Sequence, residues 1–107
     1  MTQEKLAIIL KILRAGLSRI LEDKLEAVYV YGSHARGDSR PDSDIDVLVV
    51  IRRDFDYEEI LDQTIELVAD LSLEFDVVIS RAFVTKDRFD YEINPFLMNV
   101  RREAMRV

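Results

Sequence analysis

The length of 107 residues leaves room for one domain, and a hydrophobic content of 49% is enough to give residues 1–107 a single folded unit. The absence of cysteine and the single histidine exclude disulfides, thiolate metal sites and multi-histidine zinc sites. With 15 basic and 21 acidic residues the net charge is −6, which argues against nucleic acid as a ligand, because nucleic-acid-binding domains present a basic face to phosphates. Since no apolar run approaches the ~18 residues of a membrane span and no signal-peptide pattern is present, we expect a cytoplasmic protein outside the membrane.

The chain opens with an amphipathic pattern that predicts a helix from about Thr2, its expected N-cap, to about Asp23. Gly16 lies inside this helix and indicates a close packing contact. The apolar stripe that we expect to face the core consists of Leu6, Ile9, Leu10, Leu13, Leu17, Ile20 and Leu21.

Two apolar strands separated by a polar loop follow the first helix. The segment Ala27–Tyr31 is β-branched and aromatic, which predicts a strand, and Gly32 and Ser33 end it. We expect a short helical turn over Ser33–Arg36 and a loop over Gly37–Pro41, which is rich in turn-forming residues. The continuous apolar run Ile45–Ile51 is typical of a strand that is buried on both faces.

A second helix and a third strand come next. Asp56 with Glu59 has the spacing of a capping box, so we expect a helix that begins at Asp56 and ends near Ser72. The segment Phe75–Ser80 predicts a third strand, with Asp76 near its start. The apolar stripe expected on this helix consists of Ile60, Leu61, Ile65, Val68 and Leu71.

Two short helices are predicted near the end of the chain. Thr85 can cap a helix over residues 86–91, and Asn94 followed by Pro95 starts another that runs to about Glu103. The segment Ala104–Val107 predicts a short edge strand. The order of elements indicates a layered α+β (α/β) domain, in which a small mixed sheet of three to four strands packs with helices.

Two aspartates open the buried strand. Asp44 and Asp46 lie two positions apart, so their side chains point to the same face, ~6.5 Å apart along the chain. Two like charges at the start of an apolar strand are costly without a counter-ion. Carboxylate oxygens suit Mg²⁺, which completes its shell with water and substrate phosphates, so we interpret the pair as a magnesium site.

Other polar residues could join this pair. If the third strand pairs beside it, Asp76 adds a third carboxylate, and three carboxylates are the composition of a two-metal phosphoryl-transfer site. Gly32 lets the backbone approach a phosphate, and Ser33 and the amides after it offer hydrogen-bond donors. Arg36 and Arg40 in the same loop can contact phosphates through forked hydrogen bonds.

Two features that resemble site residues receive ordinary interpretations. Asp54 and Asp56 repeat the spacing of the first aspartate pair, but they follow a strand and precede a helix, so we read them as capping residues. The only histidine, His34, could serve as a general base, but we interpret it as a loop residue near solvent.

The strings GSHARG and SDIDVLV, which begin at Gly32 and Ser43, resemble the minimal nucleotidyltransferases of the DNA polymerase β superfamily. That family has Gly-Ser, about ten residues, and then Asp-x-Asp in a strand, and here ten residues separate Ser33 from Asp44. The resemblance runs from Leu6 to Ser80 and includes the order of the elements. It implies a nucleotidyltransferase fold.

The resemblance also implies residue roles and partners. Asp44 and Asp46 would hold Mg²⁺, Asp76 would be the third acidic residue, and Gly32–Ser33, supported by Arg36, would bind the phosphates of ATP or another nucleoside triphosphate. Small members of the family pair with a helical HEPN protein as toxin and antitoxin, and the nucleotidyltransferase transfers AMP to the toxin.

Larger members of the family use an additional domain to bind the base and the acceptor, and we expect the residues after Ser80 to be too few to build such a pocket. We therefore expect a homodimer or a complex with a partner. Two other functions stay open at this point: a non-catalytic antitoxin that neutralises its partner by contact, and a nucleotidyltransferase that acts on a small molecule.

Overall fold

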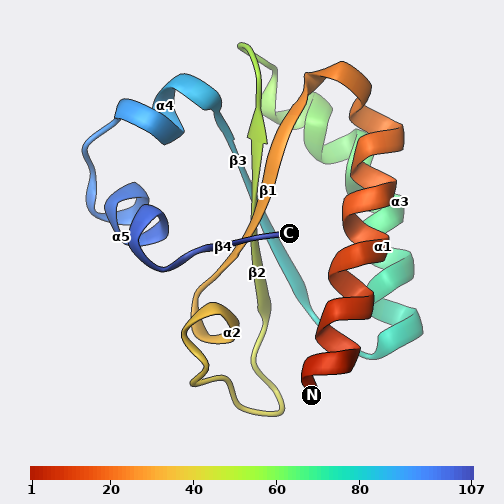
Figure 1. Ribbon diagram of the computed structural model, residues 1–107. Coiled ribbons are helices and arrows are strands. Elements are labelled where there is room, and N and C mark those ends of the chain that lie inside the picture. Colours follow the sequence, from red (N-terminus) through yellow and green to blue (C-terminus); the bar gives the residue numbers. More distant parts are fainter.

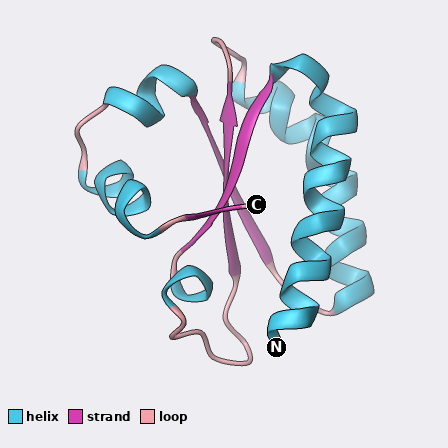
Figure 2. Cartoon of the chain, viewed as in Figure 1, coloured by secondary structure: helices cyan, strands magenta, loops and turns pink.

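Helices cover both faces of a small β-sheet in the computed structural model, which describes residues 1–107 (Figure 1). Figure 2 shows the strands crossing between a pair of long helices and a group of shorter ones. None of the helices combines the length and the hydrophobicity needed to cross a membrane. In chain order the elements are α1 (Gln3–Leu21), the 3₁₀ turn η1 (Glu22–Lys24), β1 (Leu25–Tyr31), α2 (Ser33–Arg36), β2 (Ile45–Ile51), α3 (Tyr57–Phe75), β3 (Ile79–Thr85), α4 (Lys86–Tyr91), α5 (Pro95–Glu103) and β4 (Met105–Arg106).

The sheet has the strand order β3-β2-β1-β4 and is mixed, as predicted. β1 pairs antiparallel with β2 and with β4, whereas β2 and β3 run parallel and are joined through α3. Because β2 has a neighbour on each side and helices over each face, its apolar run is buried on both faces, which confirms the expectation for residues 45–51.

Two hydrophobic clusters hold the layers together. The larger cluster joins α1 and α3 to one face of the sheet through alternate strand residues such as Val28 and Val47. The smaller one lies on the opposite face, where Leu97 and Val100 of α5 pack against β1, β2 and β3. A Cβ atom added at Gly16 would lie 2.6 Å from Leu67 of α3, so glycine is what lets α1 and α3 approach, as the sequence indicated.

The predicted helix starts are confirmed by their capping hydrogen bonds. The side chains of Thr2, Asp56 and Asn94 each accept hydrogen bonds from amides in the first turn of the helix that follows. The short turn α2, the helix α4 and the edge strand β4 also lie where the sequence placed them.

The predicted third strand over residues 75–80 was wrong, because helix α3 continues to residue 75 and β3 begins only at residue 79. Asp76 ends the helix in the left-handed conformation (φ 53°, ψ 55°), which aspartate adopts more readily than most residues. The amides of Asp76 and Val77 both donate to the carbonyl of Ser72 and close the helix end. Asp76 therefore lies in the connection before the strand.

The apolar stripe of α3 also differs from the prediction at one position. Ile65 is 57% exposed and faces away from the core. The buried position is taken by Thr64, which satisfies its hydroxyl by donating to the carbonyl of Ile60 and accepting from Arg81 Nε. The expected core position of Ile65 was wrong, because a threonine whose hydroxyl is paired internally can take the buried position instead.

Candidate active site

The end of β1 and the start of β2 meet at one edge of the sheet. The antiparallel register sets Tyr31, the last residue of β1, opposite Asp46. Gly32 then turns the chain into α2, which lies at this edge beside the loop that returns to β2 (Figure 1). The two motifs found in the sequence are therefore brought together by strand pairing.

Gly32 and Asp46 are in direct contact. Gly32 has φ 73° and ψ −151°, a conformation that is essentially restricted to glycine. A Cβ atom at this position would lie 2.4 Å from Oδ2 of Asp46, closer than any real contact. The position therefore requires glycine for two independent reasons, its backbone conformation and the space that the carboxylate occupies.

The Asp44–Asp46 pair is electrostatically unfavourable in the free protein. Burial and then the negative charge of Asp44 raise the pKa of Asp46, while His34 and Arg36 oppose this rise. Burial and the same Asp46 charge raise the pKa of Tyr31. Neither aspartate forms an ion pair within the chain. Two oxygen donors with excess negative charge and no protein counter-ion fit a hard divalent cation such as Mg²⁺.

The interpretation of His34 as a loop residue near solvent was wrong. His34 lies in α2 and is 8% exposed. Its Nε2 atom lies 3.4 Å from the carbonyl oxygen of Ser43, so it joins α2 to the residue that precedes Asp44. The side chain thereby helps to hold the loop against the site. His34 is not part of an apolar pattern in the sequence, so nothing there indicated that it would be buried.

Arg36 contacts a residue that sequence reasoning did not include. Its Nη1 donates to Oε1 of Glu103, at the end of α5, over 3.3 Å. The amide of Gly32 donates to the same Oε1 atom, also over 3.3 Å. No local motif links positions that lie 67 and 71 residues apart, so only the fold could identify Glu103.

Arg40, the second loop arginine considered from the sequence, lies in a tight turn. Its amide donates to the hydroxyl of Ser43, and its carbonyl accepts from the amide of Ser43. The turn fixes the backbone just before Asp44, while the Arg40 residue itself is exposed.

Asp76 is exposed at the end of α3 and is not gathered with the other two carboxylates. No group of three acidic or histidine side chains is close enough in the structure to hold a metal ion together. In β3 the residue beside Asp46 is Ser80, and Asp76 lies four residues before Ser80, ahead of the start of the strand. It lines a shallow pocket of about 230 Å³ with Asp42 and Ser43. Its role as third carboxylate stays a prediction.

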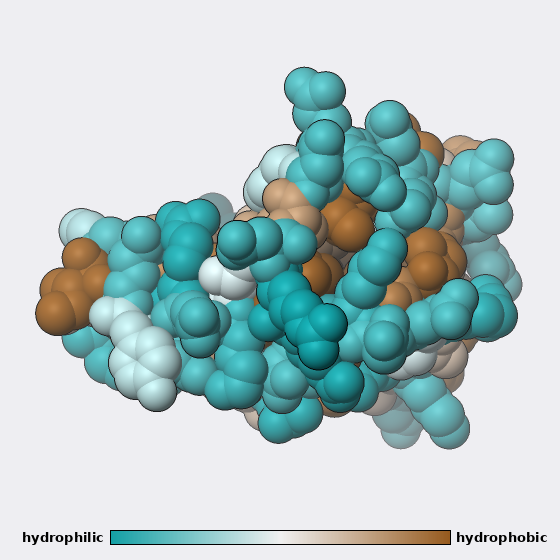
Figure 3. All heavy atoms as spheres, turned by 90° about the horizontal axis from the view of Figure 1, so that it is seen from above, coloured by the Kyte–Doolittle hydropathy of each residue, from teal (hydrophilic) through white to brown (hydrophobic).

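A larger cavity of about 490 Å³ lies at the opposite end of β2. It is lined by Ile51, Phe55 and Ile60 at its floor and by charged residues around them. Figure 3 looks onto this end of the molecule, where hydrophobic atoms are visible in a hollow with a hydrophilic rim. Neither cavity includes Gly32 or Asp46, which are both half-buried.

We expect Gly32→Ala to destabilise the protein more than Gly37→Ala. Both glycines have positive φ, but a Cβ atom at Gly37 meets nothing within 4 Å, so this variant should cost about 1 kcal/mol. Gly32→Ala adds the clash with Asp46 and should cost more than about 2 kcal/mol. Urea unfolding measures both. In an Asp46→Ala background the cost of Gly32→Ala should fall, and an unchanged cost would refute the contact.

We expect Asp46→Asn to raise the unfolding temperature at neutral pH. The pKa of Asp46 is raised in the folded protein, so the folded state binds this proton more tightly than the unfolded state. The stability that protonation contributes is present below the ordinary aspartate pKa of about 4 and is lost as the pH rises through the folded pKa. The advantage of the variant should therefore shrink between pH 7 and about pH 3.5, as thermal unfolding will show. An equal advantage at both pH values contradicts this explanation, and Asp54→Asn is the control.

Solved structures share this fold over nearly the whole chain. A toxin–antitoxin complex with AMP-PNP contains a chain with a TM-score of 0.61 at 21% identity, over 99% of this chain and 72% of that one. A protein provisionally named minimal nucleotidyltransferase has a TM-score of 0.58 at 27% identity over 95% of both chains. A complex of a tri-AMPylated HEPN toxin with its MNT antitoxin from Shewanella oneidensis has a TM-score of 0.53 at 21% identity, over 99% of this chain and 71% of that one.

Sequence comparison places the chain in a family. A protein of Methanocaldococcus jannaschii, provisionally named protein adenylyltransferase, is 38% identical over 72 residues, which are 67% of this chain and 72% of that protein. The profile of the family described as polymerase beta, nucleotidyltransferase matches residues 16–94, which include both strands of the candidate site and the connection that carries Asp76. The chain therefore belongs to the polymerase beta family of nucleotidyltransferases.

Proposed function

We propose that this protein transfers AMP from ATP to a hydroxyl group of a partner protein in a Mg²⁺-dependent reaction. The observation that carries this proposal is the contact between the Gly32 turn and the Asp44–Asp46 pair, because it sets a phosphate-binding backbone against two metal-binding carboxylates. The name of the Methanocaldococcus relative, protein adenylyltransferase, supports the choice of AMP and of a protein acceptor.

Each residue of the site has a proposed role. Asp44 and Asp46 would hold Mg²⁺, which when bound would neutralise the triphosphate and orient its α-phosphate for attack. The Gly32 amide and the Ser33 hydroxyl would bind phosphate oxygens, and the Arg36 guanidinium would add a charged donor. A net charge of −6 makes such cationic help necessary for a triphosphate ligand.

The reaction is a displacement at phosphorus. The acceptor hydroxyl oxygen bonds to the α-phosphorus, the bond from that phosphorus to the bridging oxygen of the β-phosphate breaks, and pyrophosphate is released. The hydroxyl proton must pass to a nearby base, and we assign this part to Asp76, the third carboxylate of the family pattern. Its position beside Asp42 and Ser43 puts it at the same edge of the sheet as the other two.

We propose that a second polypeptide completes the site. Gly32 and Asp46 line neither of the two cavities described above, so these cavities offer no place beside them for the adenine base or the acceptor. Figure 3 shows hydrophobic side chains standing out at the end formed by α4 and α5. The exposed large side chains of this region are Tyr91, Ile93, Phe96, Met98 and Met105.

We propose that the partner is a helical protein of the HEPN type, so that the two chains form a toxin–antitoxin pair. The structural neighbours that contain a toxin and an antitoxin support this assignment. A homodimer in which a second copy covers the open site is the other arrangement that would complete it.

Incubation with ATP, Mg²⁺ and the helical partner should increase the partner's mass by one or more AMP units, which intact-protein mass spectrometry will detect. The double variant Asp44→Asn/Asp46→Asn should lower the rate at least about 100-fold, because positioned metal ligands supply several kcal/mol of transition-state stabilisation. The matched control is Asp54→Asn/Asp56→Asn, which has the same spacing and charge change and keeps a capping residue at position 56.

The contrary outcomes are distinct. Tight complex formation without any mass gain would identify a non-catalytic antitoxin that acts by contact. Transfer to a small hydroxyl compound in place of the partner would identify the third candidate activity. An equal mass gain with the Asp44→Asn/Asp46→Asn variant would show that these two aspartates are not needed for AMP transfer and would refute the proposed site.

Asp76→Asn tests the proposed third carboxylate. Asparagine also adopts the left-handed conformation, so the variant keeps the end of α3 and removes only the charge. We expect the AMP-transfer rate to fall by at least about tenfold while the unfolding temperature stays unchanged. The reason is that a positioned general base typically raises a reaction rate by roughly 10²–10⁴-fold. An unchanged rate would show that Asp76 serves only as the end of the helix.

A further inference from the structure

The carboxylate of Glu103 occupies two of the three donors that the proposed function assigns to phosphate, the Gly32 amide and the Arg36 guanidinium. Its Oε1 atom accepts from the Gly32 amide and from Arg36 Nη1, each over 3.3 Å, and Oε2 lies 3.5 Å from the same Nη1. A carboxylate and a phosphate both present anionic oxygens to N–H donors, so the two groups require the same place. The Glu103 carboxylate therefore lies where the proposed function places a phosphate group.

Glu103 is less exposed than Asp38, the other acidic partner of Arg36. Asp38 pairs with Arg36 Nε over 3.2 Å, but its side chain is 62% exposed, compared with 22% for Glu103. Glu103 also engages the Gly32 backbone, which Asp38 does not. Asp38 has the larger effect in raising the pKa of Arg36, but only Glu103 binds Arg36 and the Gly32 amide together.

The segments on both sides of Glu103 hold it in this position. After Glu103 the chain forms β4, which pairs with Tyr29 and Val30 of β1. Before it, Leu97 and Val100 anchor α5 in the smaller hydrophobic cluster.

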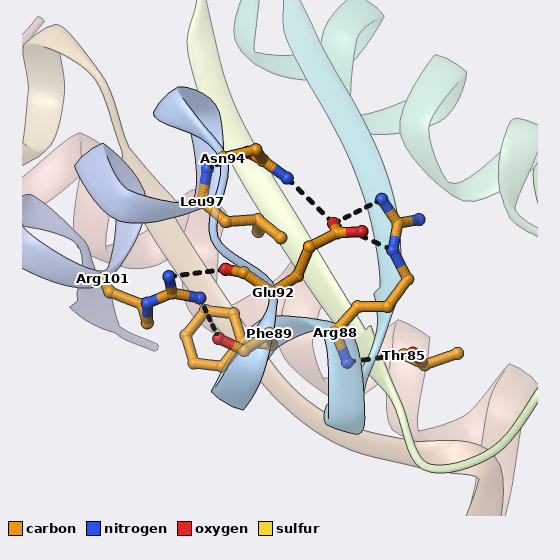
Figure 4. Close-up of polar contacts among 7 residues, drawn as sticks. All are labelled: Thr85, Arg88, Phe89, Glu92, Asn94, Leu97 and Arg101. Carbon is orange, nitrogen blue, oxygen red and sulfur yellow. Dashed lines mark hydrogen bonds and ion pairs between the residues drawn. The ribbon is translucent and has the colours of Figure 1, made fainter.

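Polar contacts at both ends of α5 fix this helix against α4 (Figure 4). Arg101 donates from α5 to the carbonyls of Phe89 and Glu92, over 2.6 and 2.7 Å. The Glu92 carboxylate accepts from Arg88 and from Asn94, the N-cap of α5. The backbone that carries Glu103 is therefore held by tertiary contacts on both sides.

We propose that Glu103 is an internal competitor of the nucleotide, whose carboxylate must leave Gly32 and Arg36 before the phosphates of ATP can bind there. This inference rests on the proposed phosphate-binding role of Gly32 and Arg36. If the contact with Glu103 is formed in most molecules, the observed affinity for phosphates is lowered by the fraction of molecules in which it is open. Glu103 then determines how tightly the site holds its nucleotide.

The proposal is tested by the binding of Mg²⁺ with AMP-PNP, and of inorganic tripolyphosphate, to the intact protein by calorimetry. Glu103→Gln keeps the size of the side chain and removes its charge. It should bind both phosphate compounds about tenfold more tightly than the unsubstituted protein. This is the gain expected if Glu103 contacts Gly32 and Arg36 in about 90% of the unsubstituted molecules and the substitution abolishes that contact. Adenosine, which has no phosphate, should bind equally to both proteins.

Glu74→Gln is the matched control. It makes the same change in net charge at an exposed position near the end of α3. Equal tightening in Glu74→Gln and Glu103→Gln would attribute the effect to net charge and overturn the proposal. Unchanged or weaker binding by Glu103→Gln would also overturn it, and would leave the proposed function intact if AMP-PNP still binds.

Absence of AMP-PNP binding in every variant would overturn both the inference and the proposed function. Tighter binding without AMP transfer to a partner would support the inference and count against the proposed acceptor. Because Glu103→Gln could fold poorly, Glu103→Asp provides a second variant with the same charge and a shorter reach. It should also bind tripolyphosphate more tightly, and an affinity equal to that of the unsubstituted protein would contradict the competition.

Discussion

The register of β1 against β2, with Tyr31 opposite Asp46, is the constraint on which the rest of the site depends. This register sets the end of β1 beside the carboxylate of Asp46 in β2. The close approach is possible only because Gly32 has no side chain. A slip of one residue would turn Asp46 to the other face of the sheet, where its charge would take the place of a buried hydrophobic side chain. Strand pairing therefore determines the chemistry that this edge of the sheet can perform.

The two faces of the sheet make different contributions. The face covered by α1 and α3 contains most of the buried hydrophobic residues, and it lies away from Gly32 and Glu103. The face covered by α4 and α5 has a small cluster of six buried residues, and it is the one that extends to the site through Glu103. Stability thus comes mainly from one layer, whereas the contacts that adjust the site come from the other.

The sequence predicted the features that depend on neighbouring residues. The β1–β2 unit, with Gly32 and the Asp44–Asp46 pair, lies within one short segment, so spacing and strand pattern were sufficient. The start of β3 was misplaced because Asp76 can end a helix as readily as it can open a strand, and only the hydrogen bonds to Ser72 decide between them. The burial of His34 and the contact of Glu103 with Gly32 arise from the packing of distant segments, and no periodicity encodes them.

The two aspartates of the pair differ in mechanical freedom. Asp46 is held by strands on both sides, with Tyr31 as its neighbour in β1 and Ser80 as its neighbour in β3. Asp44 precedes the first residue of β2 and is exposed, so its backbone is not part of the sheet. Asp46 is therefore fixed by the sheet, whereas the position of Asp44 depends on the turn at Arg40–Ser43 and on the contact of His34 with Ser43.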